Sequence, residues 1–485
     1  MPIRPAPILQ TVPPELAEGL ERLRTELGVP DGFPPEVTAA AERAAAAPRL
    51  PQTDRTDLEF VTIDPPGSMD LDQALFIERD GSGYLVWYAI ADVAAFVDPG
   101  GPIDAEAHRR GQTFYAPHQR TALHPPELSE DAASLLEDQV RPAQLWRLPV
   151  DERGQCTEPS VQRALVRSRA RLTYEQVQAQ LDDGTAGESL QLLKEVGLLR
   201  EQVERERGGV SLNIPEQEVH VADDGSWVLA FRSTLPVEGW NAQISLLTGM
   251  AAAQLMLAAK IGIVRTLPPA DEGSLRKLRT TARALGIDWP AEMDYPEFVR
   301  SLDPSRSRDA AMMYACTTLF RGAGYAAFNG TVPEQAQHAA LAIEYAHCTA
   351  PLRRLIDRYT GEICVAISAG EPVPEWVTSE LDGLPETMAA SDRRAKQYER
   401  GIVDLTEALV LSTRVGEQFT GTVVSVDDDG SKGRLVVADP AVEANVTGKK
   451  LPLGEQVTAT LVKADVAKGE VRFEVGTGSG TQTNN

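Results

Sequence analysis

The chain has 485 residues, a formal net charge of −24 and 42% apolar residues. It is too long for one hydrophobic core, so two to four domains are expected. The acidic balance argues against a protein that holds nucleic acid by diffuse positive charge, but it does not exclude a local basic groove. The four cysteines form no CxxC pair, and prolines interrupt the start of the chain where a signal peptide needs an apolar run. We therefore expect a cytoplasmic protein without disulfides.

Two short helices are predicted near the start of the chain. Residues 14–27 and 34–46 have helical patterns that each open with proline, and GVPDGF separates them. Two helices alone make a poor core, so we expect them to dock on another part of the protein. We assign residues 1–52 to a small helical domain, with helix-turn-helix as one interpretation.

Residues 53–410 are predicted to form a mixed α+β domain. Strand patterns begin at residue 58, and two β-rich runs flank RDGSG, which indicates a hairpin. Residues 160–207 are predicted to be helical, and more helical patterns follow. This order of elements is typical of an α+β body.

One stretch, residues 244–264, is apolar enough to be mistaken for a membrane span. Gln254 and Lys260 interrupt it, and alanine and glycine dilute it. A lysine near the centre of a lipid bilayer is costly, so we predict a buried core helix and no membrane partner.

The sequence pattern near the end of the chain differs from that of the preceding domain. Residues 411–475 contain five short alternating runs separated by turns that carry glycine. This count and length predict a five-stranded barrel of the OB type. The last residues, 476–485, have no core-forming side chains and are predicted to be a flexible tail.

The stretch VTIDPPGSMDLDQALFI places three aspartates, Asp64, Asp70 and Asp72, in apolar surroundings. A calcium-binding EF-hand is excluded, because Met69 and Leu75 stand where that loop needs glycine and glutamate. A solvated acidic turn remains the simple alternative. Carboxylates without cysteine or histidine suit Mg²⁺ or Mn²⁺, and such a site can activate water and offset charge on a phosphodiester.

Four motifs in order resemble the ribonuclease II / ribonuclease R (RNB) exoribonuclease family. They are TIDPPGSMDLDQA, then IADVAAFV with GPIDAEAHRRGQTFYAP, then HPPELSEDAASLLEDQVRPA, and finally CTAPLRRLIDR. The likeness covers about residues 58–410. It implies an RNB-type catalytic domain of mixed α/β structure, followed by the OB-fold barrel as an RNA-binding domain.

The resemblance also implies roles for individual residues. Asp64, Asp70 and Asp72 would hold the catalytic Mg²⁺, with Mn²⁺ as an alternative. Arg353 and Arg354 would face the scissile phosphate, as planar guanidinium groups suit phosphate oxygens.

Three further residues would bind RNA by the same resemblance. Tyr115 looks like the tyrosine that stops the last base in the channel, and Tyr174 is similar to an aromatic residue that stacks near the 3′ end. Glu399 looks like the acid that reads the ribose 2′-hydroxyl.

Simple structural roles stand beside these assignments. The arginine pair could form a helix-surface salt bridge with Glu362 or Asp357. Tyr115 and Tyr174 could be packing residues. The six histidines show no metal-ligand spacing, so we predict structural roles for them.

The chain departs from the family pattern at several positions. Gln73 stands at the family's fourth acidic position, which lowers the negative charge of the site and predicts weaker metal binding. Ala89 replaces the histidine of the second motif, and Leu212 stands where some members carry a stacking phenylalanine. Some fifty helical residues replace the two cold-shock folds that the family would place at the start.

We therefore expect a processive 3′-to-5′ exoribonuclease that hydrolyses single-stranded RNA to 5′-monophosphates and acts as a monomer. Asp72, Arg353 and Arg354 are its predicted catalytic residues. Lys449, Lys450 and Lys463 on the terminal barrel would extend a local basic track. Two alternatives are an RNA-binding regulator that has lost catalysis, which Gln73 suggests, and a hydrolase acting on another phosphodiester such as DNA.

Overall fold

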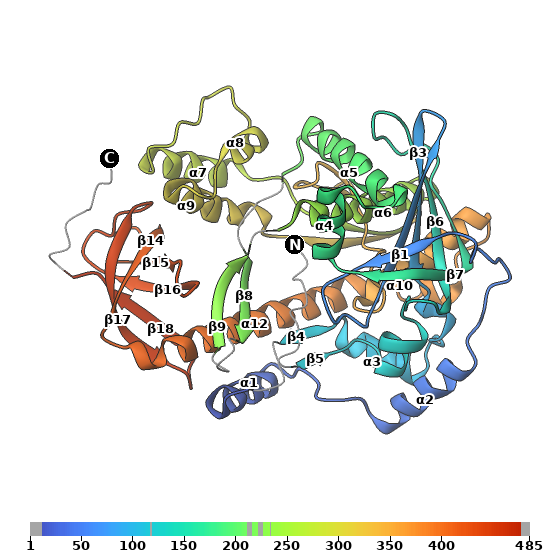
Figure 1. The fold of residues 1–485 in the computed structure, drawn as a ribbon, viewed down its shortest axis with the longest axis horizontal. Helices are drawn as coiled ribbons and strands as arrows, with labels where there is room; N and C mark the ends of the chain where they lie inside the picture. Colours follow the sequence, from blue (N-terminus) through green and yellow to red (C-terminus); the bar gives the residue numbers. More distant parts are fainter. Residues whose placement is uncertain (1–11, 117–118, 211–215, 222–226, 233, 477–485) are drawn as a thin grey trace.

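The computed structural model describes residues 12–116, 119–210, 216–221, 227–232 and 234–476. Figure 1 shows two β-barrels at opposite ends of the molecule, one built from β1, β2, β3, β6 and β7 and the other from β14 to β18. The long helix α12 (Leu384–Leu411) runs between them. The structure therefore confirms a mixed α+β body followed by a C-terminal barrel.

The first barrel carries the acidic loop. Its five strands pair in a closed order, β1 (Phe60–Ile63), β2 (Gln73–Asp80), β3 (Gly83–Ala91), β6 (Val140–Val150) and β7 (Ser160–Leu172). The pairs are antiparallel except β1 with β7, which is parallel. The predicted hairpin at RDGSG is confirmed, since Asp80 pairs with Gly83 at the β2–β3 turn.

Strand β3 is buried along its whole length because its two faces belong to two different cores. Tyr84, Val86, Tyr88 and Ile90 lie in the larger core. This core also includes residues of the helices α5 (Glu188–Glu206), α6 (Pro236–Ala259) and α10 (Leu355–Ala369). Leu85, Trp87, Ala89 and Ala91 lie in a second core on the other side. This alternation is the ordinary two-residue period of a strand covered on both faces.

The helical prediction for residues 160–207 is wrong in its first part. Ser160–Leu172 forms strand β7, and helices begin only with α4 (Tyr174–Asp183) and α5 (Glu188–Glu206). Hydrogen bonding to β6 on one side and β1 on the other closes the barrel. Tertiary pairing of this kind overrides the local helical preference of the sequence.

The apolar stretch at 244–264 lies mostly in α6 (Pro236–Ala259). By length and composition, α6 is the one helix among the described residues that could cross a membrane. It packs against α5 and α10 (Leu355–Ala369), and Ile244, Leu247 and Met256 lie in the larger core. This packing agrees with the predicted core helix.

The N-terminal helices dock on two separate parts of the body. α1 (Pro14–Glu26) packs on α12, where Leu16 and Leu20 share a core with Tyr398 and Ile402. α2 (Pro35–Ala46) packs on α3 (Pro102–Arg110) and belongs to a different core. The expected docking is thus present, and the two helices contribute to two different cores of the α+β body.

The C-terminal barrel confirms the predicted five-stranded fold. Its strands follow the closed order β14 (Gln418–Val426), β15 (Lys432–Val437), β16 (Val442–Thr447), β18 (Glu470–Glu474) and β17 (Gln456–Asp465). Strand β16 pairs in parallel with β18, and the other neighbours are antiparallel.

The remaining strands form small sheets outside the two barrels. Four two-stranded sheets are β4 (Phe114–Ala116) with β5 (Gln119–Thr121), β8 (Glu216–Val221) with β9 (Trp227–Arg232), β10 (Ile261–Thr266) with β11 (Gly324–Asn329), and β12 (Gln337–His338) with β13 (Ile343–Glu344). The other α-helices are α7 (Glu272–Ala284), α8 (Tyr295–Ser301), α9 (Ser307–Cys316) and α11 (Glu375–Thr378).

Candidate active site at the acidic loop

The acidic loop, residues 64–72, joins β1 to β2. The backbone N–H of Asp64 donates to Leu172 (3.1 Å) and extends the pairing of β1 with β7. At the other end, Leu71 donates to the Ser134 hydroxyl (2.9 Å), which in turn donates to the Met69 carbonyl (2.6 Å). These bonds hold both ends of the loop against the barrel.

Asp72 is the most deeply buried of the three aspartates, with 3% of its surface exposed. Its Oδ1 accepts from the backbone N–H of Leu352 (2.8 Å), and its Oδ2 lies 3.5 Å from Nε of Arg353. Burial raises the pKa of Asp72 to about 8, Arg353 opposes this, and the charge of Asp70 adds to it. The negative charge of Asp72 is therefore only partly compensated.

The two neighbouring arginines point to different places. Arg353 lies beside Asp72, whereas Arg354 makes two hydrogen bonds of 2.8 Å to Asp357 in the first turn of α10. The predicted alternative, a salt bridge on the helix surface, is therefore correct for Arg354, whose partner is Asp357. The other predicted partner, Glu362, pairs with Arg163 instead. The structure brings Arg353 to the acidic loop and places the Arg354 guanidinium on Asp357.

Asp70 is bound by an arginine that sequence reasoning missed. Arg120 forms an ion pair with Asp70 and a second one with Glu130 (2.5 Å). It lies on β5, directly across from Tyr115 on β4. This opposition depends on the register of β4 with β5, which no motif in the sequence indicates.

The two predicted tyrosines both lie near the loop. The Tyr115 hydroxyl is buried without a hydrogen-bond partner in the described chain, and Asp70, Asp72 and Arg353 are among its charged neighbours. Burial and the charge of Asp64 raise the pKa of Tyr174 to about 12, and its hydroxyl accepts from Asn241 (3.2 Å).

The other predicted positions do not join this group. Gln73 donates its side-chain amide to the Thr349 carbonyl, so its nitrogen is turned toward a backbone acceptor. Glu399 lies on α12, where burial raises its pKa to about 7 beside Asp392 and Lys396. Leu212 lies outside the described residues.

A metal ion would suit the donors, but not their present arrangement. Among the described residues, no three His, Cys, Asp or Glu side chains are grouped so that they could hold a metal ion. Arg120 holds Asp70, and Arg353 faces Asp72. The donors are nevertheless carboxylate oxygens, and the under-compensated charge of Asp72 fits a hard divalent cation.

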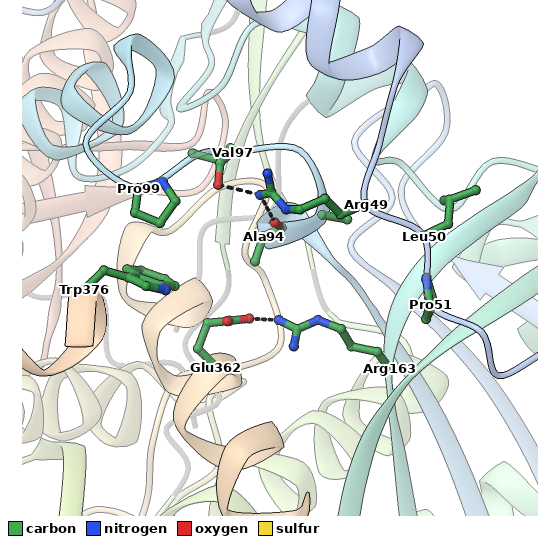
Figure 2. A pocket seen from close by; sticks show the side chains of 10 residues that line it. Arg49, Leu50, Pro51, Ala94, Val97, Pro99, Arg163, Glu362 and Trp376 are labelled. Atoms are coloured by element: carbon green, nitrogen blue, oxygen red, sulfur yellow. Dashed lines mark hydrogen bonds and ion pairs between the residues drawn. The ribbon is translucent and has the colours of Figure 1, made fainter. Parts of the chain in front are cut away.

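A cavity of about 340 Å³ lies away from this loop, between Arg49–Pro51, the segment around Val97, and the residues Arg163, Glu362 and Trp376. Figure 2 shows Arg163 joined to Glu362, and Arg49 donating to the carbonyls of Ala94 and Val97. Arg163 also pairs with Asp92 (2.8 Å). The two arginines that line the cavity, Arg49 and Arg163, are thus already paired within the protein. The acidic loop remains the better candidate for phosphate chemistry.

Comparison with protein families identifies two regions. Residues 52–367 match the RNB domain, and residues 417–476 match the RNase II-type exonuclease C-terminal S1 domain. The two matches coincide with the body of the molecule and with the C-terminal barrel.

Known proteins are similar to the chain over most of its length. Ribonuclease R of Escherichia coli is 27% identical over 84% of this chain, but the chain spans only 52% of that relative. The apo form of Mycoplasma genitalium RNase R superimposes with a TM-score of 0.85 at 19% identity, covering 96% of this chain and 78% of that one. Yeast Ssd1, described as a pseudonuclease, superimposes with a TM-score of 0.67 at 16% identity, covering 95% and 53%.

Proposed function

Because the chain belongs to the RNB family of exoribonucleases, we propose that it is itself an active enzyme. It removes nucleotides processively from the 3′ end of single-stranded RNA by water attack and releases 5′-monophosphates. The observation that carries this proposal is the contact of Arg353 with Asp72, 281 residues apart in sequence, with Tyr115 close enough to feel both charges. A cation for phosphate and an aromatic ring for a base therefore meet at one place.

The roles of the residues follow from their contacts. Arg353 donates to the phosphate and offsets the charge that develops there. Its backbone carbonyl accepts from Thr113 (3.0 Å), which keeps the arginine beside the strand of Tyr115. Tyr115 and Tyr174 hold the terminal bases in register with this phosphate.

A divalent cation, Mg²⁺ or Mn²⁺, would be held by Asp64 and Asp72, and by Asp70 once Arg120 has released it. When bound, such an ion supplies a water of lowered pKa. We also propose that the enzyme is a monomer in the cytoplasm. It would act on the 3′ ends of RNA and would not associate with a membrane.

A second candidate function is an RNA-binding protein with weakened catalysis. Gln73 at an acidic position and Arg120 on Asp70 both favour it. Incubation of 5′-labelled RNA with MgCl₂ separates the two, because an enzyme yields a ladder that shortens from the 3′ end. DNA of the same sequence tests the alternative substrate.

The residue-level test is Asp72→Asn, which keeps the size of the side chain and removes its charge. We expect turnover of labelled RNA to fall by roughly 10²- to 10⁴-fold, with RNA affinity nearly unchanged in fluorescence anisotropy. Asp131→Asn, which changes an ion pair with Arg141 on an exposed side chain, is the matched control. Activity of Asp72→Asn equal to wild type would remove Asp72 from the mechanism.

A further inference from the structure

Arg120 is a cation that already occupies part of the candidate metal site. One nitrogen of its guanidinium, Nη1, forms an ion pair with Asp70, and the other, Nη2, lies 2.5 Å from Oε1 of Glu130. The arginine side chain is 13% exposed, and the side chains of Asp70 and Glu130 are 9% and 33% exposed. A single planar group therefore bridges a buried carboxylate and a more solvated one.

The backbone that carries Asp70 is fixed. The Ser134 hydroxyl accepts from the backbone N–H of Leu71 (2.9 Å) and donates to the carbonyl of Met69 (2.6 Å), so both neighbours of Asp70 are bound to it. Glu130 lies four residues before Ser134 in the sequence. The two carboxylates thus belong to segments that are bonded to each other, and Arg120 can exchange one for the other by side-chain rotation, without movement of the loop.

The buried carboxylate of Asp70 needs a cation in either state of the site. Breaking an ion pair at a buried carboxylate leaves an uncompensated charge, which costs far more than the loss of an exposed pair. A divalent ion prefers carboxylate oxygens, so it would compete with Arg120 for Asp70. Glu130 is already bound to Arg120 and can keep it when the ion enters. This competition also accounts for the absence of a grouped set of metal ligands among the described residues.

We propose that Arg120 is an internal competitor of the divalent cation at Asp70, and that Glu130 retains its guanidinium when the ion is bound. Arg120 is then a positioning residue for the proposed reaction. It holds the Asp70 side chain in the metal-free protein and sets the concentration of ion that the site requires. This inference rests on the proposed function, because it takes Asp70 as a ligand of the metal.

Binding of Mn²⁺ alone tests the competition without RNA and without turnover. Free Mn²⁺ is measured by its EPR signal in titrations of the full chain, and Asp72→Asn shows how much Mn²⁺ binds elsewhere on the acidic surface. We expect Arg120→Gln to bind Mn²⁺ about 5- to 50-fold more tightly than wild type, because Asp70 no longer has a competing partner. Affinity equal to that of wild type, or weaker, would overturn the proposal.

Arg171→Gln separates competition from a general effect of positive charge. Arg171 lies on β7, and its guanidinium donates to the carbonyl of Ser68 in the acidic loop (3.3 Å). It is therefore a cation held on the same loop through a backbone contact. Its removal should change Mn²⁺ affinity by less than about 2-fold. A gain as large as that of Arg120→Gln would show that only local charge matters and would overturn the assignment of Arg120 as a competitor.

A double-mutant cycle tests the role of Glu130. Alone, Glu130→Gln should weaken Mn²⁺ binding about 2- to 5-fold, because Arg120 has lost its second partner and stays on Asp70. Combined with Arg120→Gln, it should have no further effect, since the arginine that it would retain is absent. Effects that simply add would overturn this role of Glu130. Because Glu130→Gln leaves the pair of Arg120 with Asp70 intact, it tests the proposal even if Arg120→Gln does not fold.

Failure of this proposal can be told from failure of the proposed function, because the Mn²⁺ titrations contain no RNA. Tighter Mn²⁺ binding by Arg120→Gln, together with no turnover of labelled RNA by wild type, would support the competition and remove the proposed nuclease activity. Degradation of RNA by wild type, together with unchanged Mn²⁺ affinity in Arg120→Gln, would overturn the competition alone.

Discussion

Asp72 combines deep burial with a charge that Arg353 only partly offsets, and this has a consequence for stability. Its pKa in the folded protein is about 8, above the ordinary aspartate value of 3.8. Between these values the folded state holds a proton that the unfolded state has lost. The stability associated with neutral Asp72 is therefore fully present at pH 4 and declines as the pH rises toward 8.

Asp72→Asn copies the neutral form and should remove this decline. In EDTA, the variant and wild type should unfold at similar urea concentrations at pH 4, and the variant should be the more stable at pH 8.5, by at least about 1 kcal/mol. Asp131→Asn, which removes the charge of an exposed aspartate paired with Arg141, is the control. A difference between Asp72→Asn and wild type that is the same at both pH values would contradict the raised pKa.

Gln73 now has a structural role that its neutral side chain explains. Its amide donates to the Thr349 carbonyl, and an aspartate cannot make that bond. Gln73→Asp should lower the stability of the free protein by about 1–3 kcal/mol. It should also gain more thermal stability from MgCl₂ than wild type does, since it adds a carboxylate to the loop. Equal stabilisation of both proteins by magnesium in a melting series would refute the expected gain in metal affinity.

At the residue scale, linear motifs predicted the parts of the site that lie within them. Asp70, Asp72 and Arg353 come from short stretches, and the charges of Asp70 and Arg353 both act on buried Asp72. Arg354 diverges because the chain enters α10 there and Asp357 in the first turn takes its guanidinium. Arg120 could not be inferred, since its position depends on the pairing of β4 with β5.

At the scale of elements, the sequence predicted individual strands and helices better than it predicted which strands pair to close a barrel. The C-terminal barrel was predictable because its five strands are consecutive and separated by glycine turns. The first barrel was not, because it closes through parallel pairing of β1 with β7, about a hundred residues later. Local periodicity carries no information about such distant partners, and for the same reason β7 was predicted as helix.

Helix α12 is joined to the C-terminal barrel and to the β8–β9 hairpin through one buried carboxylate. Glu407 accepts from the Gln217 side chain (2.9 Å) and from the backbone N–H of Glu443 (2.8 Å), both on the same oxygen. Burial raises the pKa of Glu407 to about 7. The neutral form is therefore favoured in the folded state, and its stabilising effect is lost as the pH rises from about 4.5 through 7.

Two variants separate the hydrogen bonds of Glu407 from its charge. Glu407→Gln keeps a carbonyl oxygen, so it should match wild type near pH 5 and exceed it in stability at pH 8.5. Glu407→Ala removes the acceptor and should cost about 1–3 kcal/mol at both pH values. Urea unfolding at the two pH values provides the measurement. Equal behaviour of the two variants would show that this carboxylate does not join the three elements.

At the scale of the whole molecule, the net charge of −24 means that RNA, as the proposed substrate, would have to meet local groups of cations. The barrel lysines differ in this respect. Lys463 forms ion pairs with Glu470 and with Asp465 (3.8 Å), so its charge is largely neutralised by side chains of the protein itself. Lys449 and Lys450 are exposed in the segment that follows β16. Only the latter two remain good candidates for the basic track.

The salt dependence of RNA binding tests this distinction. Each phosphate neutralised on single-stranded RNA contributes about 0.7 to the slope of log affinity against log salt. Replacing Lys449 and Lys450 together by glutamine should lower the magnitude of the slope by roughly 1, whereas Lys463→Gln should leave it unchanged. Anisotropy titrations in EDTA from low to moderate KCl supply the slopes. If Lys463→Gln has the larger effect, RNA must displace the ion pairs of that lysine, and the path of the backbone over the barrel lies along β17 and β18.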